Sequence, residues 1–432
     1  MNESTLHTRR QFLRTGVLGG AVAWTLPVFL EKTFLALDAQ AADSAVQTLT
    51  GKNGPILVVL QMAGGNDGLN MVIPYADDAY HIARPKIGIP ADQVLKVNDY
   101  LGLNPKLAGL RGLYDAGNLA LIQGVGYPNP NRSHFRSTDI WQTAADSNRF
   151  EREGWIGRYF DSCCKGADPA VGISVGSQAP LAFTAQTPTG ISFSKPEQFR
   201  FISEVADDPA ATEETFRGMN SEDDAGGSVQ AYAGKASTGG DTLDYLRRTA
   251  LDAQVSSDKI LAITSKAHST VSYPNNQLGS SLSLVAKLIG GGMPTRVYYV
   301  SQGGYDTHAG QAGAHDRLMG DLDASLQAFV KDLKEQGNFD RVTLMTFSEF
   351  GRRVVENNSG GTDHGAAAPM FVLGGGVKAG IYGQQPSLTK LTDGDLMYNV
   401  DFRSVYATIL EKQLKAPSIA VLRRKFPLMN FI

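Results

Sequence analysis

Cysteine is nearly absent from this 432-residue chain, which holds only the adjacent pair Cys163 and Cys164. Two cysteines cannot form the disulfide framework of a small secreted domain, and they cannot build a zinc site from thiolates. A disulfide between neighbouring cysteines is uncommon, so reduced thiols and a minor redox role both stay open. We assign no function to the pair.

Charge is also scarce. Charged residues make up 19% of the sequence and nearly cancel, to a formal net charge of −3. Lysine and arginine form no dense basic patch, so the sequence gives no electrostatic basis for binding nucleic acid. Hydrophobic residues make up 42%, which is enough for a large core in one big domain or two ordinary ones.

Long apolar runs are missing beyond the N-terminal region, so no later segment is expected to span a membrane. Near the start, Arg9 and Arg10 precede an uncharged apolar run at 15–30, and Ala39-Gln40-Ala41 follows. This order resembles a twin-arginine export signal that is cleaved after Ala41. We therefore expect a periplasmic or extracellular protein that contacts the twin-arginine (Tat) export machinery.

The alternative for this leader is a short membrane anchor. The run is shorter than the roughly 18 residues that a span requires, and it contains Gly19, Gly20 and Pro27. It also ends near small residues of the kind that signal peptidase reads. A signal peptide at 1–41 followed by a mature α/β domain at 42–432 is the favoured organisation.

Unbroken apolar runs followed by glycine-rich or polar loops recur along the mature chain. Such runs are typical of strands that are buried on both faces in a parallel sheet. Two stretches, 104–118 and 317–337, instead place leucines at helical intervals. Strands that alternate with helices indicate an α/β fold with a mostly parallel sheet. The predicted strands are 55–65, 119–126, 295–302, 341–347 and 369–376.

Residues 174–277 have a different composition. They include the Gly/Ser/Asp-rich stretch 219–241, which is typical of a flexible surface segment. We interpret 174–277 as an insertion or cap over the sheet.

Two of the seven histidines lie within one short stretch, 301-SQGGYDTHAGQAGAHDR-317. Asp306 and His308 directly follow a predicted strand and are flanked by glycines, a setting that favours a functional site. His315 comes where the next helix is expected to begin, so we predict a surface or capping position for it.

Acidic, hydroxyl and imidazole side chains follow the other predicted strands as well. In an open α/β sheet the carboxyl ends of the parallel strands share one edge, and ligands bind there. Side chains that are distant in sequence should therefore meet. Carboxylates together with neutral imidazoles suit Zn²⁺, Mn²⁺ or another divalent metal. The candidates are Asp67, Ser133, His134, Asp306, His308, Glu349, Asp363 and His364.

Each candidate also has a purely structural explanation. Asp67, in a glycine-rich loop, could hold a turn, and Ser133 could be the N-cap of the helix that follows it. Glu349 could form only an ion pair with Arg352. His134 could be a local packing or hydrogen-bonding residue. The presence of such residues at one strand end after another favours a shared site.

Arg352 and Arg353 follow Glu349 closely in the sequence. Guanidinium groups suit two-pronged contact with the oxygens of phosphate, sulfate or carboxylate. Beside a metal site, they indicate an anionic ligand.

The leader and the motifs AGGNDGLN, NRSHF, GGYDTH, SEFGRR and GTDHG occur in this order. With them the sequence resembles the DUF1501 family of exported bacterial proteins, over most of the mature chain. That family is placed beside the sulfatases and the alkaline-phosphatase-like superfamily. The resemblance implies an alkaline-phosphatase-like three-layer α/β sandwich with a mostly parallel central sheet.

The resemblance also implies roles for single residues. Ser133 matches the position of the superfamily's nucleophile at a helix start. Asp363 stays a candidate ligand beside the last matching histidine. The superfamily's metal ligands fall on Asp67, Asp306, His308, Glu349 and His364.

Two departures from the superfamily pattern bear on activity. One residue separates Asp306 from His308, where the superfamily usually has three. Phe350 stands where the Asp-His ligand pair usually has its histidine. A complete two-metal centre is therefore in doubt, and one metal or none fits the sequence.

We therefore expect an exported, metal-dependent hydrolase or transferase that acts on a phosphate, sulfate or related ester, small or polymeric. Ser133 would attack, and a divalent metal (Zn²⁺, Mn²⁺, Ca²⁺ or Mg²⁺) would stabilise the developing charge. Arg352 would hold non-bridging oxygens. The alternative, which Phe350 motivates, is a non-catalytic exported binding or assembly protein that kept the fold.

Overall fold

The structure is a computed structural model that describes residues 54–432 except 165–168, 177, 187–189, 199–255 and 268. The predicted export signal at 1–41 and the Gly/Ser/Asp-rich stretch 219–241 lie outside the described residues. None of the helices in the described part of the chain has both the length and the apolar composition needed to cross a membrane.

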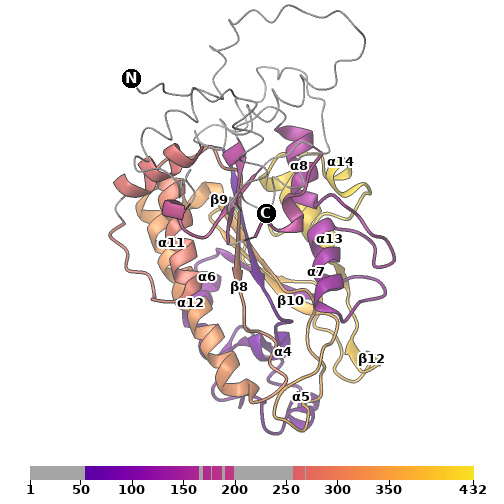
Figure 1. Ribbon diagram of the computed structural model, residues 1–432. Helices are drawn as coiled ribbons and strands as arrows, with labels where there is room; N and C mark the ends of the chain where they lie inside the picture. The colour runs from indigo at the N-terminus through magenta and orange to yellow at the C-terminus, as the bar shows by residue number, and fades with distance from the viewer. Residues whose placement is uncertain (1–53, 165–168, 177, 187–189, 199–255, 268) are drawn as a thin grey trace, which may run out of the picture.

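A central sheet lies in the middle of the fold (Figure 1). Nine of its strands lie in the described part of the chain, in the order β11-β5-β10-β9-β1-β8-β6-β7, with β14 beside β5. All neighbouring strands are parallel except that β10 is antiparallel to β5 and β9. The prediction of an α/β fold with a mostly parallel central sheet is confirmed. The strands are β1 (Ile56–Met62), β5 (Leu119–Gly126), β6 (Gly172–Val175), β7 (Ile191–Phe193), β8 (Val297–Gln302), β9 (Val342–Phe347), β10 (Ala368–Gly374), β11 (Gly380–Tyr382) and β14 (Val400–Asp401).

The middle strand β1 explains why the sheet needs helices on both faces. All seven of its residues are buried, and its six apolar residues are divided between two separate hydrophobic clusters. Val58 and Leu60 point to one cluster, whereas Leu57 and Val59 point to the other. A strand that is apolar on both sides must be covered on both sides.

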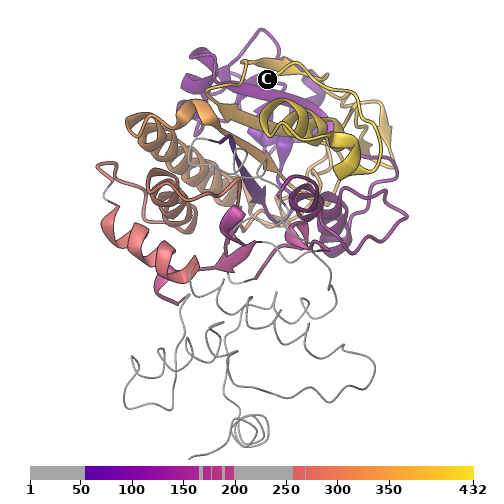
Figure 2. The ribbon, with the colours of Figure 1, turned by 90° about the horizontal axis from the view of Figure 1, so that it is seen from above.

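Helices cover the two faces and give the three layers that Figures 1 and 2 show. One face packs against α6 (Ala108–Asp115), α11 (Gln277–Gly290) and α12 (Gln311–Glu335). The other face packs against α7 (His134–Thr143), α8 (Trp155–Cys163), α13 (Phe402–Thr408), the π-helix Ile409–Gln413 and α14 (Ser418–Leu422).

Several smaller elements surround these layers. Two short helices, α4 (Gly68–Met71) and α5 (Asp78–Ala83), follow β1. A three-stranded sheet contains β2 (Val72–Ile73), β3 (Leu95–Lys96) and β4 (Gly102–Leu103), and β12 (Leu391–Thr392) pairs with β13 (Asp395–Leu396). Single 3₁₀ turns lie at Pro169–Val171, Leu181–Phe183, Pro196–Gln198 and Phe339–Arg341.

The sheet brings loops from distant parts of the sequence to one edge. Strands β1, β5, β8 and β9 run in the same direction, so the loops after them leave at the same edge. Because β10 runs in the opposite direction, the loop before it reaches this edge too. Helix α4 lies at this end of the sheet, at the bottom of Figure 1.

The middle region is described only in part. Strand β7 extends one edge of the central sheet, and α11 begins at Gln277. Residues 199–255 lie outside the described residues. The insertion or cap at 174–277 therefore stays a prediction.

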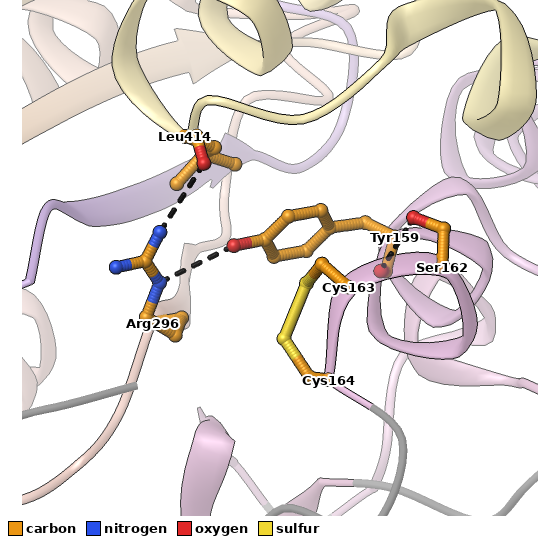
Figure 3. The surroundings of a disulfide bond; sticks show 6 residues. All are labelled: Tyr159, Ser162, Cys163, Cys164, Arg296 and Leu414. Atoms are coloured by element: carbon orange, nitrogen blue, oxygen red, sulfur yellow. Dashed lines mark hydrogen bonds between the residues drawn. A yellow bond between two sulfur atoms is a disulfide. The ribbon is translucent and has the colours of Figure 1, made fainter. Parts of the chain in front are cut away.

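Cys163 and Cys164 form a disulfide at the end of α8 (Figure 3). The cysteines are thus bonded to each other rather than reduced. In the surroundings, Arg296 donates hydrogen bonds to the Tyr159 hydroxyl and to the carbonyl of Leu414, both at 3.3 Å. None of these residues is one of the predicted site residues.

Candidate metal centre

Three side chains from three separate loops meet at the edge of the sheet. Ligand atoms of His134, Asp306 and His364 all lie within 4.8 Å of one another. His134 begins α7, Asp306 follows β8, and His364 precedes β10. His308 joins them, because its Nε2 is 2.9 Å from Nε2 of His364 and 3.1 Å from Oδ1 of Asp306.

The three histidines are held in the same way, through Nδ1. Nδ1 of His134 is 2.8 Å from Oε1 of Glu349. Nδ1 of His364 is 2.9 Å from the carbonyl oxygen of Arg132. Nδ1 of His308 is 3.5 Å from a carboxylate oxygen of Asp363. Since a carbonyl and an ionised carboxylate can only accept, we assign the proton of each ring to Nδ1 and a lone pair to Nε2.

With this assignment the Nε2 atoms face one another, and none of them carries a hydrogen that could form a hydrogen bond to its neighbour. Nε2 of His134 is buried without a hydrogen-bond partner and lies 3.6 Å from Oδ2 of Asp306. The Nε2 atoms of His308 and His364 would point lone pairs at each other across 2.9 Å. A cation shared by these atoms removes both problems, and histidines held through Nδ1 are typical of metal ligands.

The donor set indicates which metals fit. Imidazole nitrogens and carboxylate oxygens are ligand types that bind Zn²⁺, and they also suit other first-row transition metals. Ca²⁺ and Mg²⁺ prefer sites built from oxygen ligands, so they fit less well.

Asp306 is the anionic centre of the group. Its Oδ1 accepts a hydrogen bond from Nη2 of Arg352 at 2.7 Å and lies 3.2 Å from Nε2 of His364. Partial burial raises the pKa of Asp306, but the hydrogen bond and the positive charge of Arg352 outweigh this effect and lower the pKa to about 2. The carboxylate is therefore ionised at neutral pH.

Glu349 and Asp363, both predicted as metal ligands, lie behind the histidines instead. Oε1 of buried Glu349 accepts from His134 and from the backbone N–H of Gly64, at 2.8 and 2.9 Å. Asp363 accepts from the amide of Asn357 at 3.2 Å, which lowers the pKa of its carboxyl. Both side chains orient imidazole rings, because each carboxylate lies at the Nδ1 atom of a histidine.

Asp67, also predicted as a ligand, is not part of the group. It is 1% exposed, and its Oδ2 accepts from Nη1 of Arg84 at 2.6 Å and from the side-chain amide of Gln311. Burial raises the pKa of Asp67, but the charge and hydrogen bond of Arg84 hold it below its usual value. Arg84 and Gln311 thus engage Oδ2 of the carboxylate that the sequence pattern offered to a metal, whereas its buried Oδ1 has no hydrogen-bond partner.

Arg352, predicted to hold substrate oxygens, is 1% exposed. Its N–H groups donate to the carbonyls of Gly65, Thr362 and Tyr305 at 2.6, 2.8 and 3.0 Å, and to Asp306. The guanidinium therefore ties three loops together and orients Asp306, and it is shielded from a substrate.

Phe350 packs against the histidines from behind. Its ring centroid lies 4.9 Å from that of His134 and 4.5 Å from that of His364, and it is 2% exposed. The ring leaves no room for a side chain on Gly65, where a Cβ would come within 2.3 Å of it. Phe350 therefore forms an apolar wall behind His134 and His364.

Ser133 is exposed and occupies the N-cap position of α7. Its hydroxyl makes no capping hydrogen bond, so the capping explanation does not account for it. The residue directly precedes His134, which places it beside the group.

His134 was considered in the sequence beside Ser133, but it was not among the predicted metal ligands. The sequence feature that pointed to His134 was its place in NRSHF, directly after the candidate nucleophile and at a helix start.

His315 is 2% exposed, and the prediction of a surface or capping position is wrong. Helix α12 begins at Gln311, so His315 lies inside it, and its Nε2 is 3.0 Å from Oδ1 of Asn66. Burial lowers the pKa of His315.

Comparisons with known proteins give two kinds of match. A family model described as "Protein of unknown function (DUF1501)" matches residues 122–416. No curated protein matches the sequence. Among solved structures, the PsFucS1 sulfatase from Pseudoalteromonas sp. is 12% identical over 90% of this chain and 72% of that chain, with a TM-score of 0.34.

Two further structures are similar at a comparable level. A protein in the alkaline phosphatase superfamily from Vibrio parahaemolyticus is 9% identical over 85% of this chain and 72% of that chain, with a TM-score of 0.35. The C-terminal periplasmic domain of EcEptC from Escherichia coli, a complex with Zn, is 10% identical over 75% of this chain and 74% of that chain, with a TM-score of 0.33. At these identities the likeness concerns the fold alone.

Proposed function

The chain belongs to the DUF1501 family, and we propose that it is a phosphate- or sulfate-ester hydrolase that works with one divalent transition metal, best matched by Zn²⁺. One observation carries the proposal. Nε2 of His134 is buried without a hydrogen-bond partner, beside Asp306 and facing a second pair of imidazole nitrogens. A protein gains nothing from such a set of unsatisfied lone pairs unless a cation binds them.

The residues of the chain would divide the work. His134, His308, His364 and Asp306 would hold the metal, which when bound polarises an ester oxygen and stabilises negative charge. Ser133, exposed at the start of α7, is the proposed nucleophile. Its place favours an anionic group, because a helix begins with unpaired N–H groups and a partial positive charge.

Because Arg352 is buried, we assign the binding of the ester's non-bridging oxygens to two other arginines instead. Side chains of Arg132 and Arg353 are each 39% exposed and share the carboxylate of Asp395. Arg132 lies two residues before His134, and its carbonyl holds His364. The two guanidinium groups are proposed to bind the non-bridging oxygens of the ester.

The test is metal analysis of purified protein coupled to a panel of phosphate and sulfate esters. We expect one metal per chain and saturable hydrolysis, because His134, Asp306 and His364 form the one group of three possible ligands found among the described residues, and Asp67 is paired with Arg84. Ser133→Ala is expected to abolish turnover and to keep the metal, whereas His308→Ala is expected to weaken both.

Unchanged hydrolysis by Ser133→Ala would mean that Ser133 is not the nucleophile. A protein that binds no divalent metal at all would overturn the proposal.

A second candidate function rests on Phe350. Its ring fills the place of a ligand and packs on His134 and His364, so the centre has fewer ligands than the superfamily pattern provides. A non-catalytic exported protein that binds an anionic partner through its metal fits this arrangement. Full metal occupancy with no turnover on any ester would favour this candidate over the hydrolase.

Export by the Tat machinery to the periplasm or beyond is part of the proposal and rests on the leader at 1–41. Changing both Arg9 and Arg10 to lysine keeps the charge but removes the paired arginines that this route reads. We expect the variant to stay in the cytoplasm, as judged by immunoblots of cell fractions. Arg14→Lys is the matched control and should be exported normally. Periplasmic protein from the double variant would argue against this route.

A further inference from the structure

The side chain of Gln311, the first residue of α12, is fully buried and joins three parts of the chain. Its Nε2 donates to Oδ2 of Asp67. Its Oε1 accepts from Oγ1 of Thr307 at 3.1 Å and from Oγ1 of Thr362 at 2.6 Å. One amide therefore connects the loop after β1 with the two loops that carry His308 and His364.

The two threonines lie directly beside the candidate ligands. Thr307 separates Asp306 from His308, and Thr362 is two residues before His364. Both are buried, at 5% and 0% exposed. The two loops are also in close backbone contact, since a Cβ on Gly361 would come within 2.3 Å of the backbone of His308. A shift at the amide would therefore reach the histidines.

Arg84 and Asp67 hold this amide in a single orientation. Arg84 is 1% exposed, and besides Asp67 it donates to Oδ1 of Asn70 at 2.9 Å. It keeps Asp67 ionised, and an ionised carboxylate accepts hydrogen bonds but donates none. The NH₂ group of Gln311 must therefore face Asp67, which leaves its oxygen for the two threonines.

We propose that Gln311 and Asp67 are positioning residues that set the spacing of His308 and His364 for metal binding. This inference rests on the proposed metal centre. It also gives Asp67 a role, although its carboxylate is not a ligand. Hydrogen-bond partners outside the ligand shell typically change metal affinity about 10- to 100-fold when they are removed.

Gln311→Glu is the sharpest test. The substitution keeps the size of the side chain but replaces the donor toward Asp67 with a second carboxylate. We expect Zn²⁺ affinity to fall by about 10- to 100-fold, measured by competition with a chromophoric chelator. Thr362→Val removes one donor to the amide and is expected to weaken binding in the same direction, so the inference can be tested even if the first variant does not fold.

A reversed pair should restore binding. In the double variant Asp67→Asn with Gln311→Glu, the new amide can donate to the new carboxylate, and the number of charges in the network is unchanged. We expect its Zn²⁺ affinity to return to within a few-fold of the native value. A residue with only a general structural role would not produce rescue by exchange.

Gln327→Glu is the matched control on the same helix. Nε2 of Gln327 donates to Oδ2 of Asp323 at 2.6 Å, so the change again places a glutamate beside an aspartate. The position lies about 24 Å further along α12, at 1.5 Å per residue. This variant should bind Zn²⁺ like the native protein.

The outcomes separate this inference from the proposed function. If the native protein binds no metal, the metal centre itself is wrong. If the native protein binds Zn²⁺ and folded Gln311→Glu and Thr362→Val bind it equally well, the positioning role is wrong. Weakened binding without rescue by the double variant would also contradict the role of Asp67.

Discussion

Replacing His134 with alanine is expected to weaken Zn²⁺ binding by at least about 100-fold, more than the loss of a partner outside the ligand shell, and to abolish ester hydrolysis. His134 contributes the buried Nε2 that has no other partner, and Glu349 holds its ring in place. Its removal leaves fewer nitrogen donors and also leaves the carboxylate of Glu349 buried. Metal content after dialysis and a chelator competition titration measure the effect.

His81→Ala is the control for this prediction. His81 lies on α5, where its Nε2 is 2.9 Å from the carbonyl of Tyr75, and it takes no part in the centre. This variant should keep native metal content and activity. Full metal occupancy in His134→Ala would show that the metal is held elsewhere.

Replacing Arg84 with methionine is expected to lower the free energy of unfolding by about 3–5 kcal/mol, because it leaves a buried carboxylate without its counter-charge. The side chains of Arg84 and Asp67 are both fully buried, and their closest atoms are 2.6 Å apart. Arg84 also donates to the carbonyls of Val354 and Arg353 at 2.9 Å, so its loss frees two further buried acceptors. Urea unfolding monitored by circular dichroism measures the change.

Two comparisons make the Arg84 prediction specific. Arg111→Met breaks an ion pair with Asp115 whose side chains are 24% and 60% exposed, and it should cost at most about 1 kcal/mol. Adding Asp67→Asn to Arg84→Met should recover part of the loss, because the uncompensated charge is then absent. Equal costs for Arg84→Met and Arg111→Met would contradict the account of the Asp67 network.

Much of the fold could be predicted from the sequence, because its strands are continuous apolar runs. The runs at 55–65, 119–126, 295–302, 341–347 and 369–376 correspond to β1, β5, β8, β9 and β10. The direction of β10 could not be predicted, since a continuous apolar run is compatible with both parallel and antiparallel pairing. That direction matters, because it brings the loop with His364 to the common edge.

The sequence predicted which loops meet at the candidate site, but it did not predict which side-chain atoms face a metal and which support a histidine. Residues after strands were expected to meet, and the structure brings Asp306, His308 and His364 together. Whether Glu349 would face a metal or the back of a histidine depends on Nδ1 of His134, from a loop more than 200 residues away. No local pattern encodes such a contact.

Asp67 illustrates the same limit. Its glycine-rich loop after β1 matched a ligand position. In the structure, however, the Asp67 carboxylate forms an ion pair with Arg84, which lies at the end of α5. No motif in the sequence marked Arg84 as a partner of Asp67. His315 was misjudged for a simpler reason. The helix was expected from its leucines, whereas α12 begins earlier, at Gln311, and carries His315 into the interior.

The central claim is that His134, Asp306, His308 and His364 hold one metal ion. An anomalous difference map, collected at the zinc absorption edge from crystals grown with Zn²⁺ and no chelator, tests it most directly. The account predicts one strong peak among these four side chains, about 2.0–2.2 Å from three Nε2 atoms and a carboxylate oxygen. The absence of a peak there, or a peak at Asp67 instead, would contradict it.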